Sequence, residues 1–285
     1  MDLKDKEPTN QFSPPNKKLN GKKSFSFQGI LTRERIISLT TVAIVFTAWT
    51  MVTEKELVNP LFLPSPTKVW TAFIDIWQNG YKGNSLIFHI GESMYRLVFA
   101  LVLAIVTAIP LGMLSGFSKP IRAALDPIVE FYRPLPPLAY YTLLVIWLGI
   151  ENPSKIALLY LGAFAPLYIA AVSGVQRIPR DRINASLSLG ASPWQVFTFV
   201  IFPSSLPDLF TGLRTAIGFT YTTLVAAEMV AAVSGIGWMV LDASKFLRSD
   251  QIFVGIIIMG IIAIAIDACI RWVEKTQLPW IGHDS

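Results

Sequence analysis

Long stretches without a single charged residue recur along this chain, and they constrain its fold more than any other feature. Residues 36–53, 97–118 and 156–176 are stretches of this kind, with 18, 22 and 21 residues. A helix of about 20 apolar residues crosses the hydrocarbon core of a bilayer. Because 53% of the residues are hydrophobic and only 15% are charged, the sequence predicts an all-α membrane protein with about six transmembrane helices.

The predicted spans alternate with basic segments. They cover residues 36–53, about 94–116, an irregular stretch at 126–149, 156–176, about 209–233, and 252–270. Residues 1–32 are polar and are predicted to be a disordered cytoplasmic tail, so the transmembrane domain is 33–285. A secretory signal is the alternative for the first span, but no small-residue cleavage pattern follows it. With both termini in the cytoplasm, inside segments hold fifteen basic residues and outside segments six, as the positive-inside rule requires.

A short segment after the first span predicts a helix that lies flat on the outer membrane surface. Pro66 suits the first helical position, and five apolar residues fall on one predicted face: Val69, Trp70, Phe73, Ile76 and Trp77. A second short amphipathic helix is predicted outside, after the glycines near residue 235. Cys269, the single cysteine, falls in an apolar run and is predicted to be a buried, inert thiol.

The irregular span points to a transport path. Pro134, Pro136 and Pro137 lack backbone donors, and a broken helix is tolerated in a membrane where protein or a water-lined cavity satisfies the freed groups. Arg133 and Pro136 are therefore candidates for the path. Glu130 lies three residues before Arg133, so the two either form a local ion pair or leave Arg133 to face an anion.

Charged residues inside or beside other spans give two further hypotheses. Glu228 lies within a predicted span and is a third path candidate, with a hydrogen-bonded structural carboxyl as the equally open alternative. Glu92 and Arg96 are four residues apart and can pair on one helical face, either at the headgroup level or at a substrate site.

Residues 180–206 predict a helical elbow between two spans rather than a further span. Gly190 can end one short helix in a left-handed conformation, and Ser192 can cap the next. Pro193 then occupies the first helical position and Gln195 completes a capping box. The plain alternative is an ordinary pair of connecting helices.

This elbow resembles the cytoplasmic loop in permease subunits of bacterial ABC importers. That loop carries Glu-Ala-Ala, three residues, Gly, nine residues and Ile-x-Leu-Pro. The matching positions, without a gap, are Asn184, Ala185, Ser186, Gly190, Val200, Phe202 and Pro203. Four of these positions carry another residue than the family's. Asn184 replaces the Glu, which would remove a salt bridge to the ATPase; Ser186 replaces the second Ala, and Val200 and Phe202 replace Ile and Leu. The runs Phe-Tyr-Arg-Pro-Leu-Pro-Pro-Leu-Ala-Tyr at 131–140 and Val-Ile-Trp-Leu-Gly-Ile at 145–150 resemble the taurine, alkanesulfonate and nitrate group, most closely its taurine branch.

The resemblance implies a type I importer fold in which the elbow is a coupling helix that docks on an ATP-hydrolysing subunit. Its expected docking residues are Asn184, Ala185, Ser186, Leu187, Leu189, Gly190 and Ala191, with Pro203 keeping the shape. The implied assembly sits in the bacterial inner membrane and contains two ATPase copies, a second permease copy as a homodimer, and a periplasmic substrate-binding protein. ATP would be hydrolysed by the partner, with no cofactor in this chain.

Several functions lack the residues they would need. No Walker A loop, Ser/His/Asp set or metal-ligand spacing occurs, so neither catalytic nor metal-binding residues are predicted, and an integral-membrane enzyme is disfavoured. The basic residues gather at membrane edges, which argues against nucleic acid. An ion-coupled secondary transporter is the alternative class; Glu228 is one intramembrane charge of the kind it needs, but the two halves show no internal repeat. A channel would need a selectivity filter. For the substrate, taurine or a related sulfonate comes first, and nitrate, bicarbonate or another small anion second.

Overall fold

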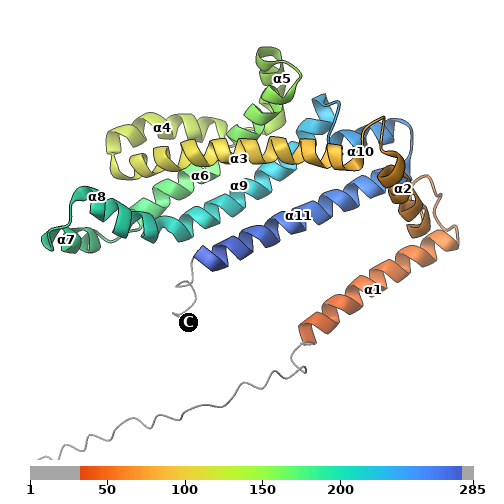
Figure 1. Ribbon diagram of the computed structural model, residues 1–285, viewed down its shortest axis with the longest axis horizontal. Coiled ribbons are helices and arrows are strands. Elements are labelled where there is room, and N and C mark those ends of the chain that lie inside the picture. Colours follow the sequence, from red (N-terminus) through yellow and green to blue (C-terminus); the bar gives the residue numbers. More distant parts are fainter. Residues whose placement is uncertain (1–32, 278–285) are drawn as a thin grey trace, which may run out of the picture. The chain divides into compact units, whose positions relative to one another are not determined.

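The computed structural model describes residues 33–277 and is helical. It divides into two compact units, Met1–Ala48 and Trp49–Ser285. The first unit contains most of α1 (Arg33–Glu54), a helix long and apolar enough to cross a membrane. The second unit holds the remaining helices (Figure 1): α2 (Pro66–Asn79), α3 (Leu86–Phe117), α4 (Lys119–Tyr132), α5 (Pro137–Leu148), α6 (Asn152–Gln176), α7 (Arg180–Ser188), α8 (Pro193–Val196), the π-helical turn η2 (Phe197–Ile201), α9 (Phe202–Ala231), α10 (Ile236–Lys245) and α11 (Ser249–Gln277).

Five helical stretches in the described residues are long and apolar enough to span a bilayer: Ile36–Glu54, Leu86–Phe117, Asn152–Gln176, Pro193–Ala231 and Ser249–Gln277. The predicted third span is different, because it is two helices. Pro134 and Pro136 interrupt the chain between α4 and α5, and α5 has only 12 residues, fewer than a span needs. The all-helical membrane fold is confirmed, with the two shorter helices α4 and α5 in place of the predicted third span.

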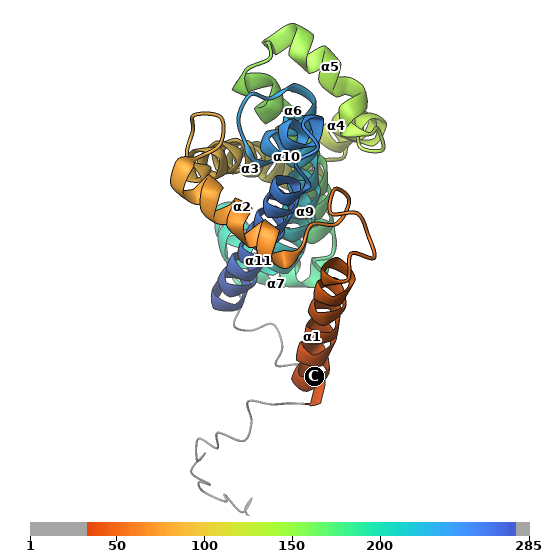
Figure 2. The ribbon, with the colours of Figure 1, turned by 90° about the vertical axis from the view of Figure 1, so that its right-hand side faces the viewer.

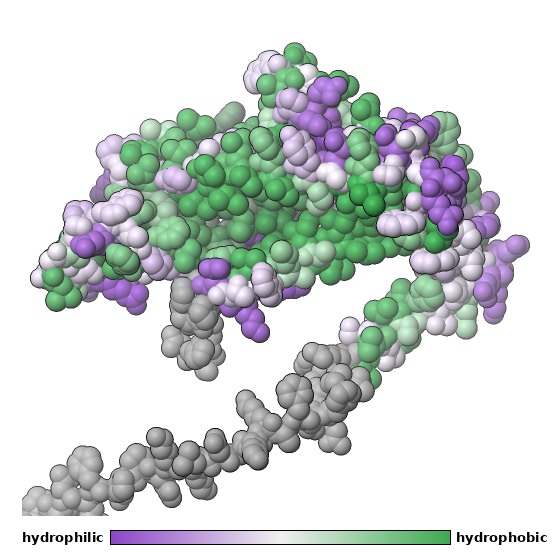
Figure 3. Space-filling view, viewed as in Figure 1, coloured by the Kyte–Doolittle hydropathy of each residue, from purple (hydrophilic) through white to green (hydrophobic). Residues whose placement is uncertain are grey.

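The core of the second unit is the contact of α6 with α3 and with α9. Figure 2 shows these helices in the middle of the view, with α5 above them. Small buried residues line this contact and let the backbones approach closely: Ala100, Ala104, Ala108, Gly112, Gly162, Ala163, Ala171 and Ala216. Tyr168 of α6 is buried among them, and its hydroxyl donates to Asp126 Oδ1 at 2.8 Å, which ties α4 to the bundle. Figure 3 shows an apolar flank along the bundle with hydrophilic residues gathered toward its ends.

Helix α2 forms where it was predicted, and the five apolar residues of its predicted face divide into buried and exposed ones. Ser65 caps it, its side chain accepting from the Lys68 N–H, and Pro66 occupies the first turn. Val69 and Ile76 are buried, whereas Trp70 and Trp77 are 63% and 54% exposed. Phe73 stacks between these two indoles. The buried stripe is therefore Val69, Ala72 and Ile76, and the tryptophans belong to the outward side.

The prediction of a buried Cys269 is wrong. The thiol lies in the second half of α11 and is exposed. An apolar run is compatible with either position in a membrane protein, since lipid accepts an apolar surface as readily as a core does.

Gly112 provides a test of the close packing between α3 and α6. A methyl group at Gly112 would come within 2.6 Å of the Tyr168 carbonyl oxygen and 2.7 Å of the Ala171 methyl. We expect Gly112→Ala to destabilise the protein by about 1–3 kcal/mol through overpacking. Gly91→Ala, in the same helix with open space around the added methyl, is the matched control. Thermal unfolding in detergent measures both, and equal transition temperatures would contradict the packing argument.

Candidate coupling elbow and transport cavity

The elbow has the local geometry that the sequence predicted. Helix α7 ends at Ser188, and Gly190 turns the chain with φ +88°, a value that glycine adopts without a steric penalty. Ser192 then caps α8: its hydroxyl accepts from the Gln195 N–H, and the Gln195 side chain accepts from the Ser192 N–H at 2.8 Å. Pro193 is the first helical residue. These caps make a defined bend at one end of the bundle, with α10 at the opposite end (Figure 1).

The elbow carries apolar side chains that nothing in the described chain covers. Helix α7 buries no residue. Leu189 is 89% exposed and Trp194, which stacks on Phe197, is 73% exposed. Large apolar side chains on a hydrophilic end of a protein are typical of an interaction surface. The sequence reasoning had included Leu189 but missed Trp194, whose signal was an indole directly after the capping residues.

A continuous helical path joins the elbow to the membrane-spanning part of α9. Helix α8 passes without interruption through η2 into α9, so the apolar stretch runs over Pro193–Ala231. Pro203 is in the first turn of α9 and has no N–H to donate, and the π-helical turn lies directly before it. On the other side of the elbow, Arg177 Nη1 at the end of α6 contacts Asp208 Oδ1 of α9 at 2.6 Å. The elbow is thus held between the ends of two spanning helices.

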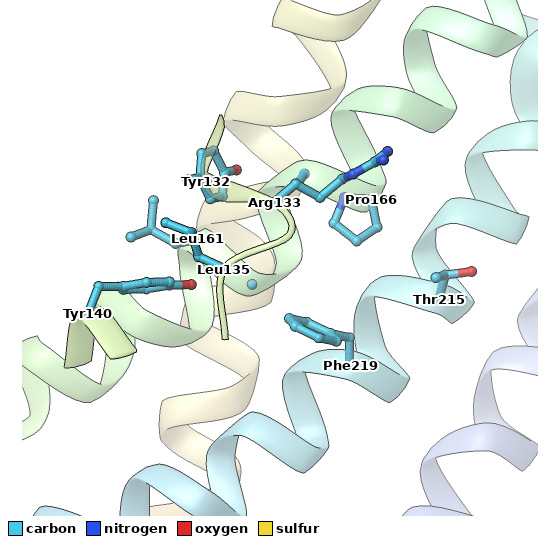
Figure 4. Close-up of a pocket in the computed structure, with 10 residues that line it drawn as sticks. Tyr132, Arg133, Leu135, Tyr140, Leu161, Pro166, Thr215 and Phe219 are labelled. Atoms are coloured by element: carbon cyan, nitrogen blue, oxygen red, sulfur yellow. The ribbon is translucent and has the colours of Figure 1, made fainter. Parts of the chain in front are cut away.

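Arg133 lies in the α4–α5 break and borders two cavities. The first, of about 130 Å³, is lined mainly by apolar and aromatic residues: Tyr132, Arg133, Leu135, Tyr140, Leu161, Gly162, Ala165, Pro166, Thr215 and Phe219. Figure 4 shows Tyr132 and Tyr140 to one side, Thr215 and Phe219 of α9 to the other, and Arg133 extending beside Pro166. The second cavity, of about 160 Å³, is more polar. Pro136 lines neither cavity; it precedes the first residue of α5.

The predicted pair between Glu130 and Arg133 does not form. Among the residues that the structure describes, the ion pairs of this region join Arg122 to Asp126, with Arg122 Nε at 2.8 Å from Asp126 Oδ2. Glu130 and Arg133 are both exposed and both border the second cavity. Of the two alternatives that the sequence left open, the local ion pair is therefore excluded in this structure.

Glu228 sits in a buried polar network at the end of the bundle opposite the elbow. Its Oε1 contacts Arg96 Nη1 at 2.6 Å and accepts from the Ser93 hydroxyl at 2.8 Å, while its Oε2 accepts from the Gly237 N–H at 2.9 Å. Arg96 and Glu228 are 2% and 1% exposed. Arg96 also pairs with Glu92 at 2.9 Å, as the four-residue spacing predicted. The carboxyl is fully satisfied, and it borders neither cavity at Arg133.

The network closes the connection between α9 and α10 around Ser234 and Gly235. Arg96 Nη1 donates to the Ser234 carbonyl oxygen at 2.9 Å, and the Gly235 N–H donates to His89 Nδ1 at 3.3 Å. Gly235 has φ +114°, and a methyl group there would overlap the Glu228 carboxyl. Nearby, burial and then the hydrogen bond to Asp242 raise the pKa of the Tyr81 hydroxyl, so that it stays a donor at physiological pH.

Comparison with known proteins agrees with this geometry. Residues 108–281 match the family model described as binding-protein-dependent transport system inner membrane component. The chain is 41% identical to the taurine transport system permease protein TauC of Escherichia coli, over 94% of this chain and 98% of that one. It is 31% identical to the putative aliphatic sulfonates transport permease protein SsuC of Bacillus subtilis, over 84% and 85%, and 32% identical to the nitrate import permease protein NrtB of Synechocystis, over 84% and 87%.

A solved structure shows the same fold. The inward-facing methionine ABC transporter MetNI contains a chain that aligns with 66% of this one and 95% of its own length, with a TM-score of 0.52 and 19% identity. The fold and the elbow thus define a permease of the type I ABC importer class. This chain belongs to the family of inner membrane components of binding-protein-dependent transport systems. It is the multi-pass transport subunit, and not the ATP-hydrolysing one.

The Arg96–Glu228 pair provides a second test. Removing one partner of a buried ion pair leaves the other charge uncompensated, which costs about 3–5 kcal/mol. We expect Glu228→Met and Arg96→Met each to lower the unfolding temperature in detergent strongly. The double variant should lose clearly less than the sum of the two, because no fully buried charge is left without a partner; Glu92, which also loses its contact with Arg96, has a side chain that is 26% exposed.

The same variants separate the two roles considered for Glu228. If its role is structural, the double variant recovers substrate uptake together with stability. Recovered stability without any uptake would instead assign Glu228 to the transport path. Additive losses of stability would contradict the coupling seen in the network.

Proposed function

We propose that the chain is the membrane-spanning subunit of an ATP-driven importer for taurine or a related small sulfonate. Its elbow docks on an ATP-binding subunit, and a periplasmic binding protein delivers the substrate at the opposite end. The family match supports the importer class. The observation that carries the elbow's role is its shape: a glycine-turned, doubly capped bend with Leu189 and Trp194 exposed, continuous with α9.

The elbow's part in coupling follows from its connections. ATP binding closes the pair of ATPase subunits and moves the two elbows of a permease homodimer toward each other. Because each elbow is bonded to α6 through Arg177 and runs helically into α9, the push reaches both spanning helices as a rigid-body movement. The cavity between them then changes its access from one side of the membrane to the other. The chain itself holds no cofactor; ATP is consumed in the partner.

The orientation of the chain follows from charge. Both termini lie in the cytoplasm, since this arrangement puts fifteen basic residues inside and six outside. It also puts the elbow, with Arg177, Arg180 and Arg182 at its edge, on the side where ATP is available. The first 32 residues, proposed to be a cytoplasmic tail, lie outside the described part of the chain. The lipid bilayer covers the apolar flank, and no nucleic acid is involved.

The substrate proposal rests on the similarity to TauC at 41% identity, with SsuC as a further sulfonate permease. The second candidate is nitrate, bicarbonate or another small anion, which the similarity to NrtB favours at 32%. Both candidates carry a negatively charged group, in agreement with Arg133, which forms no ion pair with another described residue.

Reconstitution tests the importer against an ion-coupled carrier. Proteoliposomes that hold this chain with its ATPase subunits and binding protein should accumulate radiolabelled taurine when ATP is supplied. Liposomes with the chain alone should show no uptake under a proton or sodium gradient. Gradient-driven uptake by the chain alone would overturn the ATP-driven assignment, whereas uptake of nitrate in preference to taurine would correct only the substrate.

A charge at the elbow's turn tests coupling directly. A side chain at Gly190 meets nothing within 4 Å in this chain, so Gly190→Asp should reach the membrane in normal amounts. It should nevertheless weaken docking, because the added carboxylate would lie in the interface with the ATPase subunit and lower its binding free energy. Each loss of about 1.4 kcal/mol lowers the affinity tenfold. We expect the ATPase subunits to stop co-purifying and ATP-driven uptake to be abolished.

Gly83→Asp is the matched control. Gly83 has φ +84° and open space around an added side chain. Gly83→Asp therefore adds the same charge and a similar backbone strain as Gly190→Asp, but in the turn between α2 and α3. This variant should keep its ATPase subunits. Normal co-purification and uptake with Gly190→Asp would show that the elbow does not couple this chain to the ATPase subunits.

A further inference from the structure

The cavity at Arg133 lies halfway along two spanning helices. Its α6 residues, Leu161 to Pro166, are nine to fourteen residues after Asn152, which is about 14–21 Å of helix rise. The hydrocarbon core of a bilayer is about 30 Å thick. On α9, Thr215 and Phe219 are likewise near the middle of Phe202–Ala231. The cavity is therefore at the depth where transporters hold their substrates.

Two opposite charges border the second cavity without a partner. The charged side chains that line it are Arg122, Asp126, Glu130 and Arg133. Arg122 and Asp126 pair with each other, and Asp126 also accepts from Tyr168. Within the described part of the chain, Glu130 and Arg133 form no ion pair. A charge at membrane depth is costly unless it faces a cavity or a ligand, so this arrangement requires an explanation.

Hydroxyl groups without partners lie on the other side of Arg133. The Tyr132 hydroxyl is buried and has no hydrogen-bond partner among the described residues. A buried unpaired hydroxyl costs about 1–3 kcal/mol. Tyr132 and Tyr140 both line the first cavity, whose volume of about 130 Å³ is several times the roughly 10–15 Å³ that a water molecule requires. The site thus combines a guanidinium, unused hydroxyl donors and room for a small molecule.

We propose that Arg133 and Glu130 hold the two ends of a zwitterionic amino-sulfonate as it passes between the two cavities. The guanidinium of Arg133, which extends away from the two tyrosines in Figure 4, turns toward them to bind the sulfonate. Tyr132 and Tyr140 donate to its remaining oxygens, because a sulfonate offers three acceptors and one negative charge. The carboxylate of Glu130 binds the ammonium group. This inference rests on the proposed sulfonate substrate and adds that the permease itself recognises both charges.

The second cavity gives this site a direction. Its α6 residues are Tyr168, Ile169, Val172, Ser173 and Gln176, which lie between the middle of α6 and the end that leads to the elbow. Arg133 borders both cavities. A substrate that moves from the midplane toward the elbow therefore stays in contact with the same guanidinium while its ammonium end reaches Glu130.

Two probes distinguish the two charges. Taurine carries both groups, and ethanesulfonate lacks the ammonium. Binding is measured by ligand-observed NMR on the assembled permease and ATPase subunits in nanodiscs, without the binding protein, so that only the permease selects. Arg133→Gln should weaken both probes by about tenfold or more, as expected for the loss of a charged hydrogen-bonding partner. Glu130→Gln should weaken taurine by a similar factor and leave ethanesulfonate unchanged.

Controls separate recognition from folding. Arg214→Gln removes an arginine that is already paired with Glu274 at 3.0 Å, and it should bind both probes as the wild type does. Tyr132→Phe removes a hydroxyl that has no partner, so its unfolding temperature should not fall, yet it should weaken both sulfonates. Arg133→Lys should restore part of the affinity that Arg133→Gln loses.

Three results would contradict the proposed site. Arg133→Gln could bind both probes with wild-type affinity, or Glu130→Gln could lose affinity equally for taurine and ethanesulfonate. The third is a wild-type protein that binds neither probe. ATP-driven taurine uptake measured in parallel keeps the two proposals apart. If wild-type uptake is present and the variants match it, only the site is wrong. If the wild type shows no ATP-driven uptake, the proposed function is wrong independently of the site.

Discussion

The close contact of α6 with α3 and α9 is the constraint on which the rest of the second unit depends. In a membrane, helices gain little from burying apolar groups against each other, so association relies on close packing and polar links. The alanines and glycines along α3 and α6 permit this approach, and Gly112 leaves no room for even one methyl group beside Tyr168. With the three helices fixed side by side, the elbow and the Arg96–Glu228 network are held at opposite ends of one rigid unit.

The two ends are built from different kinds of interaction, and the difference suits different tasks. Near the α9–α10 connection, Arg96, Glu228 and Ser93 are buried and fully bonded, so that this end resists rearrangement. At the elbow, α7 buries nothing and the one long-range ion pair, from Arg177 to Asp208, has an arginine that is 75% exposed. An exposed pair contributes little stability. The elbow is thus stiff within itself through its caps, and apolar packing attaches it to the bundle, since Val196 and Ile201 are buried in one cluster with Val175 and Leu209.

Local sequence rules predicted the elements whose cause is local. Gly190, Ser192 and Gln195 specified the elbow because turn and cap chemistry act over three or four residues, and the uncharged stretches specified the spans because length alone decides whether a helix crosses a bilayer. Contacts between distant residues were beyond these rules. Glu228 was seen as an intramembrane carboxylate, but its partner Arg96 is 132 residues away, and only the packing of α3 on α9 brings them together. For the same reason, periodicity placed Val69 and Ile76 on one face with Trp70 and Trp77, but it could not show that only the first two are buried against the rest of the chain.

The break between α4 and α5 places Arg133 beside open space. Arg133 still has helical backbone dihedrals, and its N–H donates to the Val129 carbonyl oxygen at 3.0 Å, so Glu130 is one turn away although the two side chains form no ion pair. Pro134 and Pro136 end the helix immediately afterwards. No following turn of α4 covers the guanidinium, which borders two cavities beside α6. A paired arginine would offer no net charge to an anion, whereas this unpaired one is stabilised only when a substrate or water occupies the space next to it.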